Sequence, residues 1–235
     1  MPRVVVLGCG TGVGKTRVSA ALLTELARRG QACLGLKPIE SGVERGPHQH
    51  FGPVPGSDAD TLANAGNLRL PTTESHPLYA FPEPVSPHLA ARGAKLEIDV
   101  KRVTEWVARC EQAVTPLVTS HSASWTVIET AGGTFSPLSV VAANFDLARA
   151  LDPALWLLVA PDSLGVLHDL SSTLQAMRAR GRTPDHVLLC AAREPDASTG
   201  SNAAELATLG ITTVSATLAR DDDRGIRALV DLLLG

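Results

Sequence analysis

A glycine-rich segment that ends in lysine and threonine, Gly8-Cys-Gly-Thr-Gly-Val-Gly14-Lys15-Thr16, is the part of this sequence best suited to chemistry. Glycines let successive backbone N–H groups converge on phosphate oxygens, and a helix that begins here adds the positive end of its dipole. A lysine at this position neutralises the β- and γ-phosphates, and the hydroxyl that follows binds Mg²⁺. The predicted nucleotide-binding residues of this loop are Gly10, Thr11, Gly12, Val13, Gly14, Lys15 and Thr16.

The spacing of this loop differs from the common G-x-x-x-x-G-K-[ST] pattern. That pattern puts a glycine at position 9, where this sequence has Cys9, so five residues separate Gly8 from Gly14. Gly10 and Gly12 still let the backbone of the longer loop adopt the tight conformations that other residues disfavour. A glycine-rich turn without a ligand is the alternative. The coincidence of a strand, Gly-Lys-Thr and an amphipathic helix favours the phosphate site.

Acidic side chains that could complete a magnesium shell lie at the ends of other predicted elements. Glu129 ends an apolar strand and should reach the carboxyl edge of the sheet, where ligands gather; an ordinary strand-end acid is the alternative. Asp58 begins a predicted helix, where it could bind metal or only cap the helix, and Asp60 is the rival ligand.

A second lysine, Lys37, ends another predicted strand. A solvated surface lysine is the commonest role of such a residue. At the carboxyl end of a strand beside the phosphate loop, its ammonium could instead stabilise the charge on a transferring phosphoryl group.

A parallel α/β sheet is needed to bring these residues together, and the sequence predicts one. Short β-branched or leucine-rich runs alternate with helical patterns, which is the signature of βαβ units. We expect one domain over residues 1–235, with a parallel sheet of about seven strands flanked by helices. Strands are predicted at 4–7, 32–36, 126–128, 155–160, 186–190 and 212–215, helices at 18–26, 100–114 and 167–180, and loops at 42–56 and 115–124.

Composition excludes several classes of protein. The net charge is −3 and no basic stripe is visible, so nucleic acid and anionic membranes are poor partners. The four cysteines contain no C-x-x-C pair, which argues against a disulfide framework or a zinc site. No apolar run approaches roughly 18 residues and no signal peptide is evident, so a cytoplasmic protein is expected.

Further short motifs accompany the phosphate loop in a fixed order. They are Lys37-Pro38 with Ser41-Gly42, Ser57-Asp58-Ala59, Pro84-Val85-Ser86-Pro87-His88, Glu129-Thr130-Ala131-Gly132-Gly133 and Pro137-Leu138. Together with the loop, whose extra residue is shared, they resemble the dethiobiotin synthase family of the P-loop NTPase superfamily. The resemblance is good to about residue 145, fair to about residue 190 and weak beyond.

The resemblance implies a homodimeric, flavodoxin-like α/β enzyme of biotin biosynthesis. Members carboxylate 7,8-diaminopelargonate with CO₂ to a carbamate, which takes the γ-phosphoryl group of ATP; the second amine then displaces phosphate and closes the ring. By resemblance, Thr16, Asp58 and Glu129 hold Mg²⁺, Lys15 and Lys37 neutralise phosphates, Thr11 and Ser41 border the carbamate, and Glu129 and Gly132 contact the nucleotide.

This sequence departs from the family pattern at several positions. Thr130 stands where glycine is usual, and His168 stands where the family has an asparagine that binds the substrate carboxylate across the dimer interface. Cys190-Ala191 replaces an adenine-reading asparagine, and the segment 212–218 lacks the proline of the base-binding loop. The choice between ATP and CTP is therefore open.

Other functions are compatible with a phosphate loop. They are a related P-loop ligase such as the synthetase part of a cobyrinate-type amidotransferase, a partner-regulated ATPase of the partitioning type, and a nucleotide-binding relative with a changed substrate or lost catalysis. The amidotransferase needs a glutaminase part for which this chain has no room, and the loop lacks the early lysine usual in partitioning ATPases.

Overall fold

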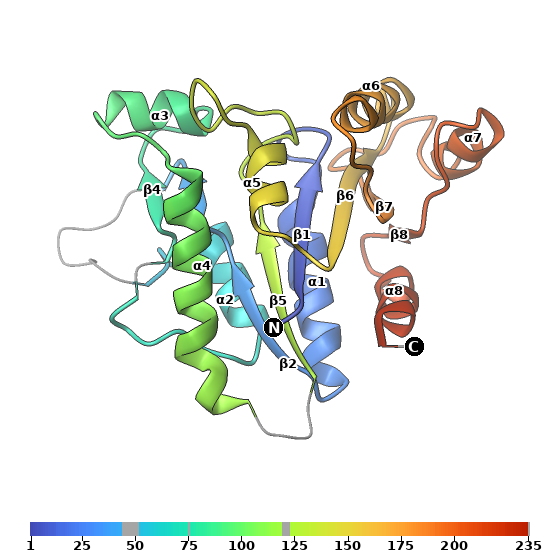
Figure 1. Ribbon diagram of the computed structural model, residues 1–235. Helices are drawn as coiled ribbons and strands as arrows, with labels where there is room; N and C mark the ends of the chain where they lie inside the picture. Colours follow the sequence, from blue (N-terminus) through green and yellow to red (C-terminus); the bar gives the residue numbers. More distant parts are fainter. Residues whose placement is uncertain (44–51, 75, 119–122, 235) are drawn as a thin grey trace.

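A parallel β-sheet between two layers of helices forms the body of the protein in the computed structural model, which describes residues 1–43, 52–74, 76–118 and 123–234 (Figure 1). Within these ranges the main sheet has six strands in the order β2-β5-β1-β6-β7-β8, and every neighbouring pair is parallel. Its strands are β1 (Arg3–Gly8), β2 (Ala32–Leu36), β5 (Ser124–Glu129), β6 (Leu155–Asp162), β7 (His186–Ala191) and β8 (Ala216–Leu218). A second sheet pairs β3 (Ile39–Ser41) with β4 (Tyr79–Phe81).

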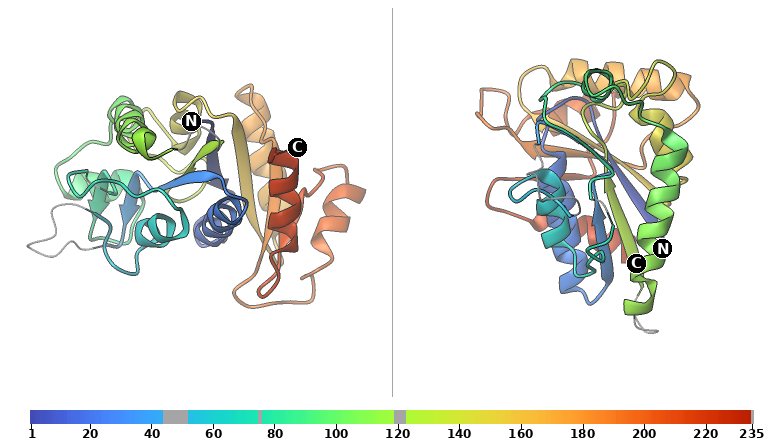
Figure 2. Two further views of the ribbon diagram at one scale, coloured as in Figure 1. Left: turned by 90° about the horizontal axis from the view of Figure 1, so that it is seen from below. Right: turned by 90° about the vertical axis from the view of Figure 1, so that its left-hand side faces the viewer.

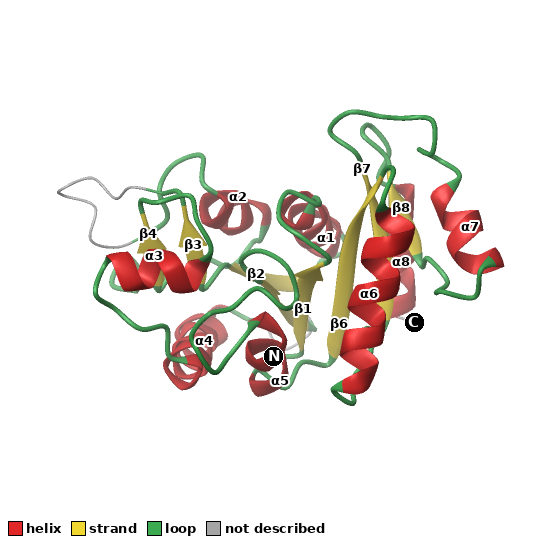
Figure 3. Cartoon of the chain, turned by 90° about the horizontal axis from the view of Figure 1, so that it is seen from above, coloured by secondary structure: helices red, strands yellow, loops and turns green. Residues whose placement is uncertain are grey.

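Helices cover both faces of the main sheet, as the views from below and above show (Figures 2 and 3). One face packs against α1 (Lys15–Arg28), α2 (Asp58–Ala65) and α8 (Arg224–Leu234). The other packs against α4 (Val100–Val114), α5 (Asn144–Ala150) and α6 (Val166–Ala179). The remaining helices are α3 (Pro87–Gly93), the short 3-10 helix η1 (Thr115–Leu117) and α7 (Asn202–Thr208).

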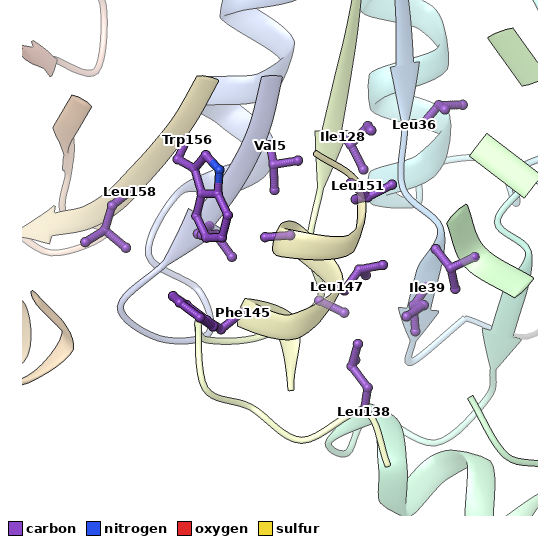
Figure 4. Packing of buried hydrophobic residues seen from close by; sticks show 14 of the residues in the cluster. Val5, Leu36, Ile39, Ile128, Leu138, Phe145, Leu147, Leu151, Trp156 and Leu158 are labelled. Atoms are coloured by element: carbon purple, nitrogen blue, oxygen red, sulfur yellow. The ribbon is translucent and has the colours of Figure 1, made fainter. Parts of the chain in front are cut away.

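The strands are apolar on both sides because helices bury both faces. In β1, Val4 and Val6 belong to the core under α1, while Val5 and Leu7 belong to the core under α5. Figure 4 shows the second core, where Phe145 of α5 lies near Trp156 of β6. Their ring centroids are 5.4 Å apart.

The order of the strands creates the crevice that a ligand needs. From β1 the chain passes through α1 on one face of the sheet, whereas from β5 it passes to α5 on the other face. The two connections diverge at the carboxyl edge, uppermost in Figure 1, and leave the ends of β1 and β5 open between them. The expected parallel α/β fold is confirmed, and β5 lies between β1 and β2 in its main sheet, unlike the 2-1-3-4-5 order of flavodoxin itself.

Most predicted elements are confirmed. The bounds of β2 and α4 are those predicted, and four other strands run one to three residues longer than predicted. The strand predicted at 212–215 is wrong, since β8 begins at Ala216. Residues 212–215 stay exposed or half-buried, whereas Ala216 and Leu218 are buried, so packing rather than β-branched composition decides this strand.

Two smaller expectations also need adjustment. The main sheet has six strands rather than about seven, and β3 and β4 form their own sheet; strands of three residues are too short to show a periodic pattern. Of the predicted loops, residues 44–51 and 119–122 lie outside the described residues, and 115–117 form η1. In the described part of the chain, no helix is long and apolar enough to cross a bilayer.

Candidate active site

The glycine-rich loop connects β1 to α1 and owes its shape to its glycines. Gly14, the N-cap of α1, has φ +98°, and a Cβ there would lie 2.4 Å from the Sγ atom of Cys190. A Cβ on Gly8 would lie 2.8 Å from a methyl group of Val13. Side chains are therefore excluded at both ends of the loop. None of the described side chains caps α1, so its first N–H groups remain available to an anion.

The side chains at the start of α1 point in two directions. Lys15 is buried and its Nζ atom donates to the carbonyl oxygen of Gly10 at 3.1 Å, so the lysine folds back along its own loop. Burial lowers the pKa of Lys15. Thr16 donates from its hydroxyl to Oε1 of Glu129 at 2.9 Å, which joins the loop to the end of β5.

Lys37 and Glu129 form a buried ion pair at the centre of the site. The Nζ atom of Lys37 donates to Oε1 of Glu129 at 2.8 Å and also to Asp58. Burial alone would lower the pKa of Lys37, but the carboxylates of Glu129 and Asp58 outweigh it and raise that pKa above its usual value. A solvated surface lysine is thus the wrong description of Lys37, which is 5% exposed.

One oxygen of this cluster lacks a partner. Oε2 of Glu129 is buried and accepts no hydrogen bond from the described residues. A buried carboxylate oxygen is costly to leave unsatisfied unless a cation or donor binds there. With Asp58 and the hydroxyl of Thr16, it makes an oxygen donor set of the kind that Mg²⁺ accepts when phosphates supply further ligands.

The donor set is not a complete protein metal site. No group of three or more His, Cys, Asp or Glu residues suited to a metal occurs among the described residues. Mg²⁺ in phosphoryl-transfer enzymes is commonly held by one or two carboxylates together with substrate phosphates. The residues therefore fit Mg²⁺ bound with a triphosphate better than a metal ion bound alone.

The structure separates the two aspartates that the sequence left as rivals. Asp58 lies beside Lys37, whereas the carboxylate of Asp60 accepts from the backbone N–H of Gly56 at 2.9 Å and from Asn64 at 3.0 Å. The carboxylate of Asp60 is thus already hydrogen-bonded within and just before α2, the helix that both aspartates share. The cap of that helix is Ser57, not Asp58.

Most of the predicted site residues line one pocket of about 440 Å³ at the carboxyl edge. Those that line it are Thr11, Gly12, Gly14, Lys15, Thr16, Lys37, Ser41, Asp58, Glu129 and Gly132. Two do not line it: Gly10 contributes its carbonyl oxygen to Lys15, and Val13 faces a neighbouring pocket.

Three lining residues were not predicted as site residues: Arg17, Glu40 and Ala131. Arg17 directly follows the Gly-Lys-Thr motif, and Ala131 belongs to the run 129–133. Their positions beside these motifs could therefore have identified both as site residues. Glu40 sits inside the motif 37–42 but has no residue-type signal of its own. Burial raises the pKa of Glu40.

The neighbouring pocket, of about 530 Å³, shares Gly12, Gly14 and Arg17 with the first. It is lined further by residues at the ends of β6 and β7 and by residues that follow β6, β7 and β8, among them Cys190 near the end of β7 and Arg220 after β8. Arg220 donates to the carbonyl oxygens of Ala192 and Arg193, and Arg17 donates to those of Ala219 and Arg220. Arginine contacts to main-chain carbonyls therefore hold this side together.

Two of the sequence departures have a plain structural account. The hydroxyl of Thr130 donates to the carbonyl oxygen of Val6 at 3.0 Å, and Thr130 is buried and does not line the pocket. Its side chain points into the sheet rather than into the site. His168 is exposed on α6 and lines neither pocket.

Known proteins resemble this chain in sequence. A family model described as an AAA domain matches residues 2–224. The ATP-dependent dethiobiotin synthetase BioD of Anaeromyxobacter sp. (strain K) is 37% identical over 207 residues, which cover 87% of this chain and 83% of that protein. BioD of Nitrosospira multiformis is 34% identical over 174 residues, covering 74% of this chain and 69% of that protein.

Solved structures resemble it in fold. A MinC:MinD cell division protein complex of Aquifex aeolicus matches with a TM-score of 0.51 and 13% identity, covering 100% of this chain and 96% of that one. A ParA family ATPase of Chlorobium tepidum also has a TM-score of 0.51, with 11% identity, covering 98% of this chain and 91% of that one. At these identities the likeness shows the fold alone.

Proposed function

This chain belongs to the dethiobiotin synthetase family, and we propose that its ATP-dependent ring closure takes place at the cluster of Lys15, Lys37 and Glu129. The activity is that of an ATP-dependent ligase of biotin biosynthesis. The observation that supports this location is the buried ion pair of Lys37 and Glu129 beside the phosphate loop. Among the described residues, Oε2 of Glu129 has no hydrogen-bond donor.

The proposed substrates are 7,8-diaminopelargonate, CO₂ and a nucleoside triphosphate. One amine adds to CO₂ and loses a proton to give a carbamate; a carbamate oxygen then attacks the γ-phosphorus and the nucleoside diphosphate leaves. The second amine attacks the carbamate carbon and loses a proton, phosphate departs, and the cyclic urea is complete. No side-chain nucleophile is needed, since positioning and charge stabilisation supply the catalysis.

Thr16, Asp58 and Glu129 would hold Mg²⁺, which neutralises phosphate charge when bound. Lys15 would exchange the carbonyl of Gly10 for phosphate oxygens. Lys37 would exchange its two carboxylates for the oxygens of the transferring phosphoryl group. The buried position of both ammonium groups supports these roles, because charge stabilisation is stronger where water is excluded.

The remaining pocket residues would handle the carbamate and the nucleotide. Thr11 and Ser41 both line the 440 Å³ pocket and carry hydroxyls that can hydrogen-bond to the carbamate. The nucleoside would extend into the adjoining pocket of about 530 Å³. Arginines and main-chain atoms dominate that side, so we keep both ATP and CTP as proposed substrates.

We also propose that residues 1–235 form one domain and that two copies form a homodimer. Val140, Val141 and Leu164 are the most exposed large apolar side chains of the described residues, at 95%, 85% and 84%. All three follow β5 or β6 at the carboxyl edge, where a second copy would cover them beside the pocket. Sedimentation of the purified protein tests the dimer. A cytoplasmic location stays a prediction.

The reaction is tested by phosphate release with Mg²⁺ and bicarbonate, with and without 7,8-diaminopelargonate, with ATP and CTP in parallel. Release that requires the diamine and equals the dethiobiotin formed supports the proposal, and the better nucleotide identifies the base. Triphosphate binding without diamine-dependent release would contradict it and point to a changed substrate.

A further inference from the structure

Glu40 of β3 is a buried carboxylate that contacts another element of the site. It is 4% exposed and lines the pocket. Its Oε1 atom accepts from the backbone N–H of Asp58 at 2.7 Å, and its Oε2 atom accepts from that of Ala59 at 3.2 Å. These are the first two N–H groups of α2, so a carboxylate from a strand of the small sheet caps this helix.

Each free N–H group at the start of α2 has an acceptor, and Glu40 supplies two of these acceptors. A helix leaves four N–H groups without partners at its start. Glu40 takes those of Asp58 and Ala59, the hydroxyl oxygen of Ser57 takes that of Asp60 at 3.1 Å, and the carbonyl oxygen of Val54 takes that of Ser57 at 3.0 Å. Ser57 is local to the helix. Among the described residues, Glu40 provides the hydrogen bonds that join this helix to β3, the strand that follows Lys37.

The placement of Asp58 depends on this connection. Its side chain is 45% exposed, so packing does not fix it. Its backbone N–H is held by Glu40 and its carboxylate is held by Lys37. The chain between β3 and α2, residues 42–57, is long, and the direct contact of Glu40 with the first N–H groups of α2 ties the start of this helix to β3.

We propose that Glu40 is the positioning residue for Asp58 and that it determines how tightly the site binds the metal of the metal–triphosphate complex. Each oxygen of Glu40 already accepts from an N–H group of α2, so the role assigned to Glu40 is to orient Asp58 rather than to bind the metal. This inference rests on the proposed role of Asp58 in holding Mg²⁺. Residues that orient a metal ligand commonly change metal affinity by about 10- to 100-fold when substituted.

The test measures Mn²⁺ affinity by electron paramagnetic resonance in the presence of a non-hydrolysable ATP analogue. Glu40→Gln keeps the shape of the side chain, but its amide nitrogen cannot accept from one of the two N–H groups. We expect about tenfold weaker Mn²⁺ binding. Ser57→Ala, which removes the other cap of the same helix, is the matched control and should change the affinity by less than about twofold.

A double-mutant cycle with Asp58→Asn decides whether Glu40 acts through Asp58. In the Asp58→Asn background, Glu40→Gln should weaken Mn²⁺ binding no further. Additive losses, or an equal loss in Ser57→Ala, would overturn the inference. Unchanged affinity in Asp58→Asn would refute the proposed role of Asp58 itself, whereas weakened binding in that variant with normal binding in Glu40→Gln would refute only the role of Glu40. If Glu40→Gln fails to fold, Glu40→Asp, which is too short to reach both N–H groups, replaces it.

Discussion

The two adjoining pockets at the carboxyl edge are built from different kinds of contact. In the pocket of about 440 Å³, Lys37 pairs with Glu129 and Asp58, so side chains of opposite charge hold one another. On the other side, Arg17 and Arg220 donate to main-chain carbonyl oxygens of the loops after β7 and β8. The Lys37 cluster of the first pocket therefore depends on residue type, whereas the arginine contacts of the second depend on the course of the backbone.

The strongest test of this difference is the removal of Lys37. Lys37→Ala should lower kcat by on the order of 10³-fold or more, because the transferring phosphoryl group loses a preorganised cation. The far-UV circular dichroism should be unchanged, and Lys15→Ala should have a comparable effect on turnover. Lys101→Ala is the control, since that side chain is 82% exposed and remote from the pocket.

The same variant tests the fit of the metal to the cluster. Without the ammonium of Lys37, the carboxylates of Glu129 and Asp58 lose their counter-ion, so the melting temperature should fall and Mg²⁺ should restore part of it. Normal turnover by a folded Lys37→Ala protein would remove the proposed role of Lys37 and, with it, the contrast between the two pockets.

Gly14 joins the two pockets, and a side chain there should damage both. In Gly14→Ala the new methyl group meets Sγ of Cys190 at 2.4 Å, and the residue keeps an unfavourable φ of +98°. We expect triphosphate affinity to fall by at least about tenfold, since the N–H groups of the loop move from their positions. Isothermal titration calorimetry measures this directly.

Gly30→Ala separates the two causes. Gly30 has φ +75° but open space around its Cα atom, so its substitution adds backbone strain without the contact. It should lower the free energy of unfolding by about 1 kcal/mol and leave triphosphate affinity unchanged. Equal affinities for Gly14→Ala and the unaltered protein would show that the loop does not depend on its contact with Cys190.

This contrast also explains what the sequence could predict. Lys15, Thr16 and Glu129 were predicted to meet because each follows a recognisable strand, and parallel strands bring their carboxyl ends to one edge. The choice of Asp58 over Asp60 as metal ligand needed the family resemblance, because both are aspartates near the start of the same predicted helix. Only the folded chain puts Asp58 beside Lys37. The roles of all four in binding and catalysis stay predictions.

Contacts to the backbone are what the sequence could not indicate. Glu40 bonds to two N–H groups and Arg220 bonds to two carbonyl oxygens, so neither has a partner residue type to search for. The strand β8 was misplaced for a related reason, since its position is set by pairing with β7 from Leu188 onward rather than by its own composition.

In the pocket of about 530 Å³, which is proposed to hold the nucleoside, smaller effects are expected. Arg220→Ala releases the carbonyl oxygens of Ala192 and Arg193, so KM for the triphosphate should rise by about three- to tenfold while kcat stays the same. Arg178→Ala is a matched control, because Arg178 also donates to a main-chain carbonyl, that of Ile211, but outside the pocket. A fall in kcat for Arg220→Ala would mean that this side takes part in the chemistry and that the contrast is wrong.

The smallest effect should come from Thr130, one of the residues that depart from the pattern of the resemblance. Its hydroxyl donates to the carbonyl oxygen of Val6, which also accepts from the N–H of Thr130 at 3.1 Å. Thr130→Gly should therefore lower the free energy of unfolding by about 1–2 kcal/mol, through one lost hydrogen bond and a more flexible backbone. Because the side chain points away from the pocket, kcat/KM should change by less than about twofold, a margin of about 0.4 kcal/mol. Thr130→Ser keeps the hydroxyl and should retain most of the stability. A tenfold gain in kcat/KM for Thr130→Gly would show instead that threonine restrains the turn 129–133. The pocket of about 440 Å³ would then depend on the course of its backbone as much as the pocket of about 530 Å³ does.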